Sequence, residues 1–237
     1  TMDVSVRLYD KPAALLAKPI QIGDYSCHAN LDLEPNATNL RHLIHVEDDF
    51  EPLFDLDAGY KNHIRKNPKN YENDLLHLQE WAISERGFFN NDYKKVFRNA
   101  DIVCARGTLT NIAKTPFMGG EPWRIVAVRN DDIIYLHNCG AIDGTTFHPS
   151  TDVAANHREY WGHNFQRIMT SRNPDLAKLG GFDDSEVVDC RETYSVVYRS
   201  DIIMPGEDRI KLAYSSEIKA VDEWQLCRLQ NTERPYL

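Results

Sequence analysis

The sequence has no apolar run of roughly 18 residues, the length that a helix needs to cross a lipid bilayer. Residues 1–4 also lack the basic stretch followed by an apolar core that begins a secretory signal. The sequence therefore predicts neither a membrane-spanning helix nor export through a cleaved leader.

Cysteine is scarce and scattered, with five residues at positions 27, 104, 139, 190 and 227. They form no Cys-x-x-Cys pair and no other metal-ligand spacing. We therefore expect free thiols, as in a protein of a reducing compartment.

Basic side chains are in deficit, because 36 acidic residues outnumber 27 basic ones and the net charge is −9. Non-specific binding to duplex nucleic acid depends on Lys and Arg beside phosphates, so this balance argues against it. It does not exclude RNA held in a small pocket. A length of 237 residues and a hydrophobic content of 42% fit one domain over residues 1–237.

The hydrophobic pattern predicts strands interleaved with a few helices. Residues 1–50 are expected to be irregular, because Pro12, Pro19 and Pro35 interrupt any long element. Apolar spacings of three and four predict helices over 70–84 and 151–170. Short apolar runs predict strands over 102–105, 123–128, 133–139, 187–199 and 209–221. We therefore expect an α/β fold with mixed β-sheets flanked by helices.

Arg106 and Gly107 directly follow the predicted strand 102–105. A planar guanidinium at a strand end can bind a phosphate through two hydrogen bonds. An exposed arginine beside a turn glycine is also typical of an ordinary solvated surface. The residues alone leave both interpretations open.

The second predicted helix contains an unusual glycine, Gly162. Glycine inside a helix costs on the order of 1 kcal/mol relative to alanine, so it indicates close approach of another backbone or a ligand. His163 has no second ligand at helical spacing and is expected to be a helix-surface residue. Gln166 is neutral, and we expect it to be a poor metal ligand.

Glu217 and Lys219 alternate with Ile218 in the last predicted strand, so they share one face of the sheet. An acid that holds Mg²⁺ and a lysine that stabilises charge form the core of many metal nuclease sites, and Asp189 upstream could complete the set. A half-exposed strand with alternating charges gives the same pattern by chance.

Several segments in a fixed order carry a resemblance: 19–26 with 39–43, 105–117 with Trp123, 160–166, and 194–200. Together they are similar to the family of RNA 5′-end decapping nucleases typified by DXO. The third segment resembles that family's helix motif Gly-x-x-Phe-Glu, and the fourth resembles a strand before its third motif. The likeness covers almost the whole chain. It implies a mixed α/β fold in which carboxylates hold Mg²⁺ or Mn²⁺ for hydrolysis of defective RNA 5′ ends.

The departures from the family pattern are informative. Gln166 stands where the helix motif has Glu, and Lys219 stands where the Glu-x-Asp motif, matched here by Glu217, has Asp. The family's last motif, Glu-x-Lys, would begin about where this sequence stops, so the fold is expected to lack its C-terminal part. A second alignment instead matches residues 186–189 to the third motif and 217–219 to the last, which keeps Asp189, Glu217 and Lys219 as a possible site.

On the first alignment the resemblance implies a catalytically inactivated member of the family. We then expect no bound metal, nuclear localisation and a non-catalytic adaptor role in the transcription of small-RNA precursors in the germline. Its partners would be chromatin-associated proteins, with weak contact to single-stranded RNA through Arg106. The alternatives are an active Mg²⁺- or Mn²⁺-dependent hydrolase of RNA 5′ ends and a truncated piece of such an enzyme.

Overall fold

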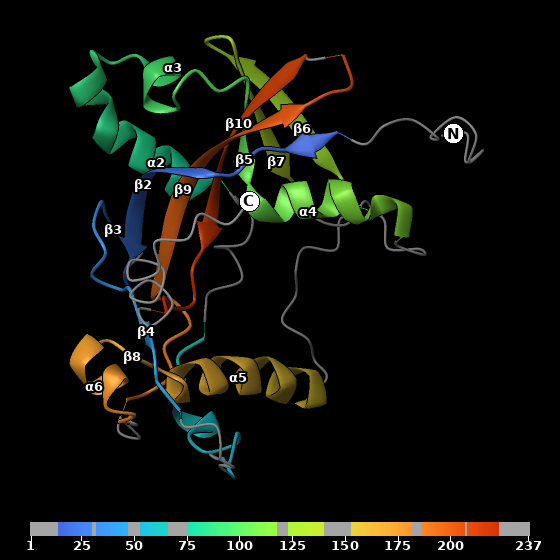
Figure 1. Cartoon of the computed structure of the whole chain (residues 1–237). Coiled ribbons are helices and arrows are strands. Elements are labelled where there is room, and N and C mark those ends of the chain that lie inside the picture. The colour runs from blue at the N-terminus through green and yellow to red at the C-terminus, as the bar shows by residue number, and fades with distance from the viewer. Residues whose placement is uncertain are drawn as a thin grey trace, which may run out of the picture.

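The computed structural model describes residues 14–29, 32–46, 53–65, 75–117, 123–139, 153–181, 186–206 and 208–222. Its largest feature is an eight-stranded sheet with the order β3-β2-β9-β10-β5-β7-β6, in which β1 also pairs with β9 (Figure 1). The strands are β1 Leu15–Leu16, β2 Ile20–Cys27, β3 Leu33–Glu34, β5 Ile102–Ala105, β6 Ile125–Asn130, β7 Ile133–Asn138, β9 Thr193–Ile203 and β10 Arg209–Glu217.

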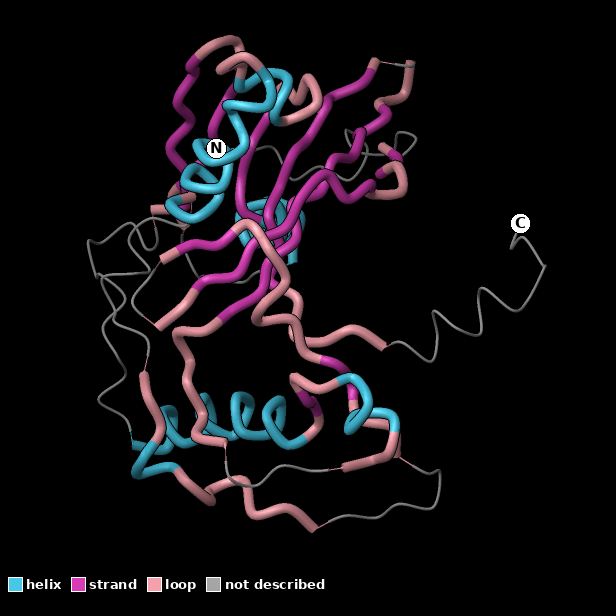
Figure 2. The backbone as a smooth tube through the Cα atoms, turned by 90° about the vertical axis from the view of Figure 1, so that its left-hand side faces the viewer, coloured by secondary structure: helices cyan, strands magenta, loops and turns pink. Residues whose placement is uncertain are grey.

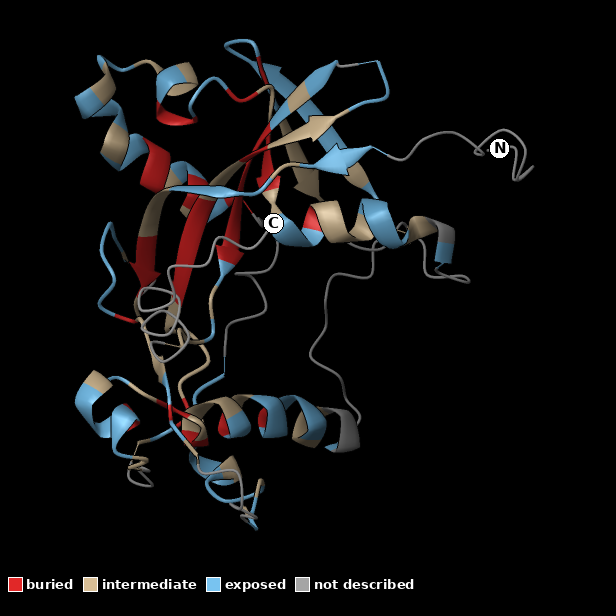
Figure 3. Cartoon of the chain, in the orientation of Figure 1, coloured by how far each residue is buried: buried red, intermediate tan, exposed pale blue. Residues whose placement is uncertain are grey.

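The sheet is mixed. Strand β5 runs parallel to both β10 and β7, while the remaining pairs are antiparallel. The β9–β10 hairpin is the longest pairing, with Arg209 opposite Ile203 at one end and Glu217 opposite Ser195 at the other. Figure 3 shows that buried residues are concentrated along β2, β9 and β10.

Helices cover both faces of this sheet. Helices α2 (Leu76–Glu85) and α3 (Tyr93–Val96) pack on one face, and α4 (Arg106–Lys114) packs on the other (Figure 1). Because side chains alternate along a strand, Val103 points to the α2 side and its neighbour Cys104 to the α4 side. A short 3-10 helix, η3 (Arg86–Phe89), continues α2, and a second one, η4 (Thr115–Phe117), follows α4.

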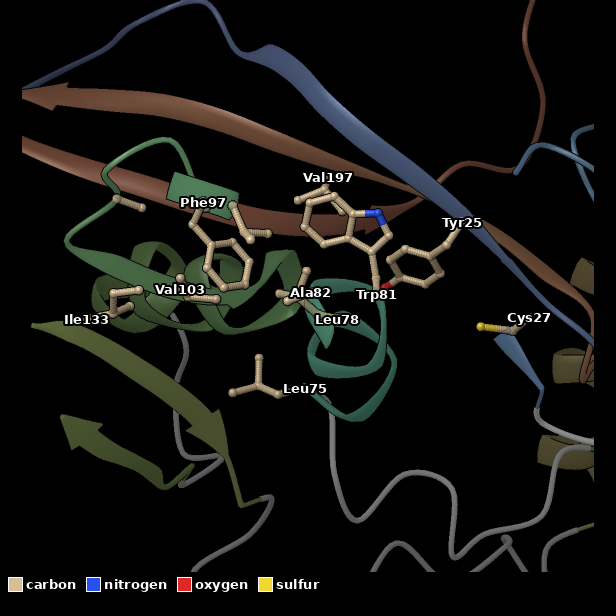
Figure 4. Packing of buried hydrophobic residues seen from close by; sticks show 13 residues of the cluster. Tyr25, Cys27, Leu75, Leu78, Trp81, Ala82, Phe97, Val103, Ile133 and Val197 are labelled. Atoms are coloured by element: carbon tan, nitrogen blue, oxygen red, sulfur yellow. The ribbon is translucent and has the colours of Figure 1, made fainter. Parts of the chain in front are cut away.

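Gly23 allows α2 to approach the sheet closely. A Cβ atom on Gly23 would lie 2.3 Å from Cζ2 of Trp81, which is only 2% exposed. Figure 4 shows the Trp81 indole beside Val197, in the cluster that also contains Tyr25 and Phe97. The β2–β9 register shifts between Gln21 and Gly23, at the same point. An indole can therefore sit directly against the strand backbone.

A second group of elements lies beyond the ends of β2, β9 and β10 (Figures 1 and 2). It consists of α5 (Val153–Ile168), α6 (Pro174–Lys178) and a two-stranded sheet of β4 (His42–Leu43) with β8 (Thr170–Ser171). A short 3-10 helix, η1 (Tyr60–Asn62), lies along α5, where the Tyr60 ring stacks on His157. The residues just before it, Leu56 and Ala58, accept hydrogen bonds from α5 side chains through their backbone oxygens. No helix in the described ranges is long and apolar enough to cross a membrane.

The expected mixed α/β arrangement agrees with the structure, but the N-terminal prediction was wrong. Residues 1–50 include the eight-residue strand β2, and Pro19 and Pro35 lie outside that strand instead of breaking it. The predicted strand 102–105 has the same bounds as β5. The predicted strands 123–128 and 133–139 correspond to β6 and β7, which pair as a hairpin with Asp131 and Asp132 at positive φ in its turn. Residues 223–237, which include Cys227 and the stretch near which the family's last motif would begin, lie outside the described residues.

Other boundaries differ from the sequence prediction. Strand β9 begins at Thr193 rather than at residue 187 and extends to Ile203, and helix α4, which was not predicted, follows β5 directly. Gly107 and two threonines weaken the intrinsic preference of α4 for a helix, but Thr108 is buried and Leu109 packs on the sheet. Tertiary contact therefore outweighs local propensity there. As expected, none of the described cysteines, Cys27, Cys104, Cys139 and Cys190, forms a disulfide bond.

Candidate functional site: an ion-paired pocket between the sheet and helix α5

A small pocket lies where β9 and β10 meet α5 and the β4–β8 pair. It encloses about 60 Å³. Its walls carry four cationic side chains and four carboxylates among their charged groups, together with a histidine, a glutamine and a cysteine. The lining residues are Asn39, Arg41, His163, Gln166, Arg167, Arg172, Glu186, Val187, Val188, Asp189, Cys190, Glu192, Thr193, Glu217 and Lys219. We call this space the ion-pair pocket.

Arg41 and Arg172 hold the carboxylate of Glu186 between them. Arg41 donates from Nη1 to Oε1 at 2.9 Å and from Nη2 to Oε2 at 2.5 Å, while its Nε donates to the Thr170 hydroxyl at 2.7 Å. Arg172 donates from Nε to Oε1 of Glu186 at 3.1 Å. The hydrogen bonds from Arg41 are the main reason that the pKa of Glu186 lies below its usual value.

The remaining donors of Arg172 are also in use. Its Nη1 donates to the Asn39 side-chain oxygen at 3.0 Å, and its Nη2 donates to Glu192. Burial by itself would lower the pKa of Arg172, but the two carboxylates outweigh that effect and raise it. Arg41, Arg172, Glu186 and Glu192 therefore form one continuous network, which we call the arginine network.

The other two carboxylates of the pocket are bound to the chain's own cations as well. Asp189 accepts three hydrogen bonds from Arg191, including one at 2.7 Å from Nη2. Burial opposes ionisation of Asp189, but these bonds outweigh it and the pKa falls below its ordinary range. Glu217 pairs with Lys219, on the exposed side of the pocket.

Helix α5 contributes two side chains to the pocket wall. Gln166 donates from Nε2 to the backbone oxygen of Lys219 at 3.4 Å, a long and therefore weak hydrogen bond. His163 is half-buried, and burial is the chief cause of its lowered pKa, with Lys219 adding to the effect. The expectation that His163 is a helix-surface residue was therefore wrong, because α5 turns this side chain into the pocket.

These donors do not fit a two-metal site. Divalent Mg²⁺ and Mn²⁺ need several unneutralised oxygen ligands, and here each lining carboxylate already pairs with Arg or Lys. Gln166 offers an amide in place of a charge. In the described part of the chain, no group of three or more His, Cys, Asp or Glu side chains could hold a metal ion.

The structure brings most of the predicted site residues together. Gln166, Glu217 and Lys219 line the ion-pair pocket, and so does Asp189 from the alternative set. Arg106 does not line it and is the exposed first residue of α4.

Arg41, Arg172 and Glu192, which complete the network, carry no functional pattern in the sequence. Arg41 and Glu186 are 145 positions apart, a separation that helix or strand periodicity cannot connect. The only sequence signal for Arg41 was its place in the resembling segment 39–43. Gly162 also differs from expectation, because among the described residues no atom outside its own stretch of helix lies within 4 Å of where its Cβ would be.

Comparison with known proteins gives the family. The family model described as "RAI1 like PD-(D/E)XK nuclease" matches residues 17–236. The chain belongs to this family. The decapping nuclease dom-3 of Caenorhabditis elegans is 30% identical over 173 residues, which cover 71% of this chain and 42% of that protein. The decapping and exoribonuclease protein of Homo sapiens is 24% identical over 216 residues, or 91% of this chain and 52% of the relative.

Solved structures of RAI1-like nucleases share the fold. Candida albicans Rai1 in complex with pU5 and Mn²⁺ superposes with a TM-score of 0.66 at 16% identity, covering 89% of this chain and 55% of the other. Schizosaccharomyces pombe Rai1 gives a TM-score of 0.60 at 19% identity, with 93% and 59% covered. The mixed α/β fold is thus that of the RAI1-like nucleases, and the chain spans about half the length of the relatives that it matches.

Proposed function

We propose that this chain is a catalytically silent RAI1-like protein that acts as a nuclear adaptor and not as a nuclease. It would be of the inactivated type that Cutoff, a germline nuclear protein of flies, represents. Its role would be to bind chromatin-associated partners and to protect or license nascent transcripts, including small-RNA precursors. RNA would be bound only weakly.

One observation carries the proposal: the cations of the ion-pair pocket belong to the protein itself. Arg41, Arg172 and Arg191 occupy the carboxylates Glu186 and Asp189 through short, charge-assisted hydrogen bonds. A metal ion would have to displace these guanidinium groups and leave them unpaired in a half-buried place, which is unfavourable. Gln166 provides no charge to offset that loss.

A metal is relevant because related structures contain one. The Candida albicans Rai1 structure holds pU5 and Mn²⁺, and a Scheffersomyces stipitis Rai1 structure holds a calcium ion. An active Mg²⁺- or Mn²⁺-dependent hydrolase is therefore the second candidate function. It is favoured by the position of Asp189, Glu217 and Lys219 in a single pocket.

A decapping and nuclease assay separates the two functions. The purified protein is incubated with Mn²⁺ or Mg²⁺ and short RNAs that carry a 5′ monophosphate, a 5′ triphosphate or a cap, beside an active relative as the positive control. We expect no release of nucleotide or cap above the no-protein level. Turnover that is lost in both Asp189→Asn and Glu217→Gln would establish the hydrolase instead.

The adaptor role and the nuclear location need their own test. A tagged copy in the organism's germline cells should concentrate in the nucleus, and nascent precursor transcripts should fall in abundance when the protein is removed. Full rescue by a Glu217→Gln, Asp189→Asn double variant would show that chemistry is not required. A cytoplasmic distribution, or rescue only by the native pocket residues, would contradict the adaptor proposal.

A further inference from the structure

Strand β6 is one edge of the large sheet as the described strands form it (Figure 1). Edge strands present unpaired backbone N–H and C=O groups, and proteins usually protect them by keeping them short or by placing proline or charged side chains there. Strand β6 is six residues long, contains no proline and carries Val126, Ala127 and Val128 in its middle. The middle of this edge is therefore open to pairing with another strand.

The pairing with β7 determines which backbone groups of β6 point away from the sheet. The Cys139 N–H donates to the backbone oxygen of Arg124, which lies opposite it, at 2.8 Å. In an antiparallel ladder such hydrogen-bonded pairs alternate with pairs that are not bonded to each other. Val126 and Val128 therefore bond to β7. The residues whose backbone groups point outward are Ile125, Ala127 and Arg129.

The same strand carries an exposed apolar row on the α2 side of the sheet. Val126 and Val128 are 42% and 53% exposed, and they lie opposite His137 and Tyr135 of β7. Tyr135 packs against the α2-side cluster, which places the two valines on that side. A groove of about 590 Å³ separates them from Leu75, just before α2. A strand added to β6 would cover both valines and remove them from water.

Two charges of opposite sign flank the valine row. Arg124 directly precedes β6 and Asp131 directly follows it, and both are exposed. Within the described part of the chain, neither side chain forms an ion pair or a hydrogen bond, whereas Arg129 pairs with Asp132 at 2.6 Å. Burial raises the pKa of Tyr135 to about 12, and the charge of Asp131 adds to this effect, which places that carboxylate near the valine side. The strand holds Arg124 and Asp131 roughly 20 Å apart, too far to pair with each other.

We propose that β6 is the interface of a symmetric homodimer, in which the β6 strands of two copies pair antiparallel about a twofold axis at Ala127. Outward-pointing groups can pair only with outward-pointing groups, and of the registers that satisfy this condition a centre at Ala127 gives the longest overlap. It places Val126 opposite Val128 of the second copy. It also brings Arg124 beside Asp131 of the second copy. Because the axis repeats each contact, the dimer contains two valine pairs and two ion pairs.

A second copy fits this edge because β6 is complementary to itself. A strand that pairs here needs apolar side chains at alternate positions, an acid to meet Arg124 and a base to meet Asp131, and β6 with its flanking residues supplies all three. The small side chain of Ala127 lies on the axis, where each copy faces the same residue of the other. The interface shares no residue with the ion-pair pocket, so it does not depend on the proposed function.

Sedimentation equilibrium of the purified protein near physiological salt measures the dimer. We expect a reversible dimer with a Kd of about 10 μM, as suits a small interface of one strand pair. Arg124→Asp and Asp131→Arg, made singly, each turn both ion pairs into repulsions and should raise the Kd about tenfold. The double variant restores both pairs at the net charge of the parent protein and should recover its Kd to within about twofold. Asp208→Arg, in the exposed turn between β9 and β10, is the charge-matched control and should leave the Kd unchanged.

A proline variant tests the strand pairing itself. Ala127→Pro removes an N–H that points away from the sheet, a change that edge strands tolerate, so the circular dichroism spectrum should persist while the dimer is lost. If this variant does not fold, the charge exchange alone decides. A protein that stays monomeric at ten times the expected Kd would overturn the proposal. So would a dimer that a folded Ala127→Pro variant retains, or a double charge variant that dimerises no more tightly than the single ones.

Discussion

The guanidinium of Arg41 and the carboxylate of Glu186 meet in a two-pronged ion pair, with N–O distances of 2.9 and 2.5 Å. The pair joins the segment before β4 to the segment before β9. The Arg41 side chain is only 13% exposed and that of Glu186 is 28% exposed, so water competes weakly for either group. In this pocket, where the family resemblance implied metal-holding carboxylates, a cation of the chain neutralises an acid.

Removal of Arg41 should destabilise the fold. Arg41→Ala leaves Glu186 with a single arginine partner and removes a bond to Thr170, so we expect a loss of about 2 kcal/mol in the free energy of unfolding. Urea denaturation followed by circular dichroism measures this loss. Lys211→Ala, on an exposed position of β10, is the matched control and should change stability by less than about 0.5 kcal/mol. Equal effects of the two variants would show that the arginine network contributes nothing.

The same pair should make stability depend on acid. Folding lowers the pKa of Glu186 below its ordinary value of 4.5, chiefly through Arg41, so the folded state favours the ionised form. The resulting stabilisation is complete above pH 4.5 and is lost as the pH falls through the lowered pKa. Glu186→Gln should therefore show a shallower fall in stability on acidification, measured by urea midpoints from pH 7 to pH 3. If the urea midpoint of Glu186→Gln falls as steeply with acid as that of the parent protein, Glu186 is not the group responsible.

Gly23 should be intolerant of a side chain. The Cβ of Gly23→Ala would overlap the buried Trp81 indole at 2.3 Å, and relief of that overlap should cost about 2 to 3 kcal/mol. Gly107→Ala is the control, because no described atom outside its own stretch of α4 lies within 4 Å of its Cβ position and alanine favours a helix. We expect Gly107→Ala to be neutral or slightly stabilising in thermal denaturation. A Gly23→Ala protein as stable as the parent would refute the packing of α2 described above.

Binding to RNA should be weak and should involve Arg106. The excess of acid opposes extended backbone contact, so we expect a Kd no tighter than about 10⁻⁵ M for single-stranded 5′-monophosphate RNA near physiological salt. Arg106→Ala should weaken binding, because the exposed guanidinium at the start of α4 can bind one phosphate. Lys211→Ala should leave the affinity unchanged. Fluorescence anisotropy with a labelled RNA measures both. A nanomolar Kd, or a Kd that Arg106→Ala does not change, would show that RNA binds to another part of the protein surface.

Local pattern in the sequence predicted much of the sheet. Strands β5, β6 and β7 follow from short apolar runs, and in the structure Asp131 and Asp132 adopt positive φ in the turn that joins β6 to β7. Helix α4 was not predicted, because its stability comes from burial of Thr108 and Leu109 against strands and not from helix propensity. Local sequence therefore determines β5, β6 and β7, whereas tertiary contacts determine α4.

In the ion-pair pocket, too, some residues could be predicted from the sequence and others could not. Resemblance and strand alternation pointed to Gln166, Glu217 and Lys219, and these residues do share a pocket. The arginine network could not be predicted, because Arg172 joins Asn39, Glu186 and Glu192, which are up to 133 positions away. Pairing across such separations depends on the folded chain and leaves no periodic signal in a single sequence.

The most direct test of a catalytically silent pocket is calorimetric titration of the purified protein with Mn²⁺ at low salt. Gln166 and the ion-paired carboxylates of Glu186, Asp189 and Glu217 should leave no stoichiometric site, so we expect only the heat of dilution. Gln166→Glu alone should not restore binding, because the arginines remain in place. A stoichiometric Mn²⁺ site of micromolar affinity in the unaltered protein would contradict the account.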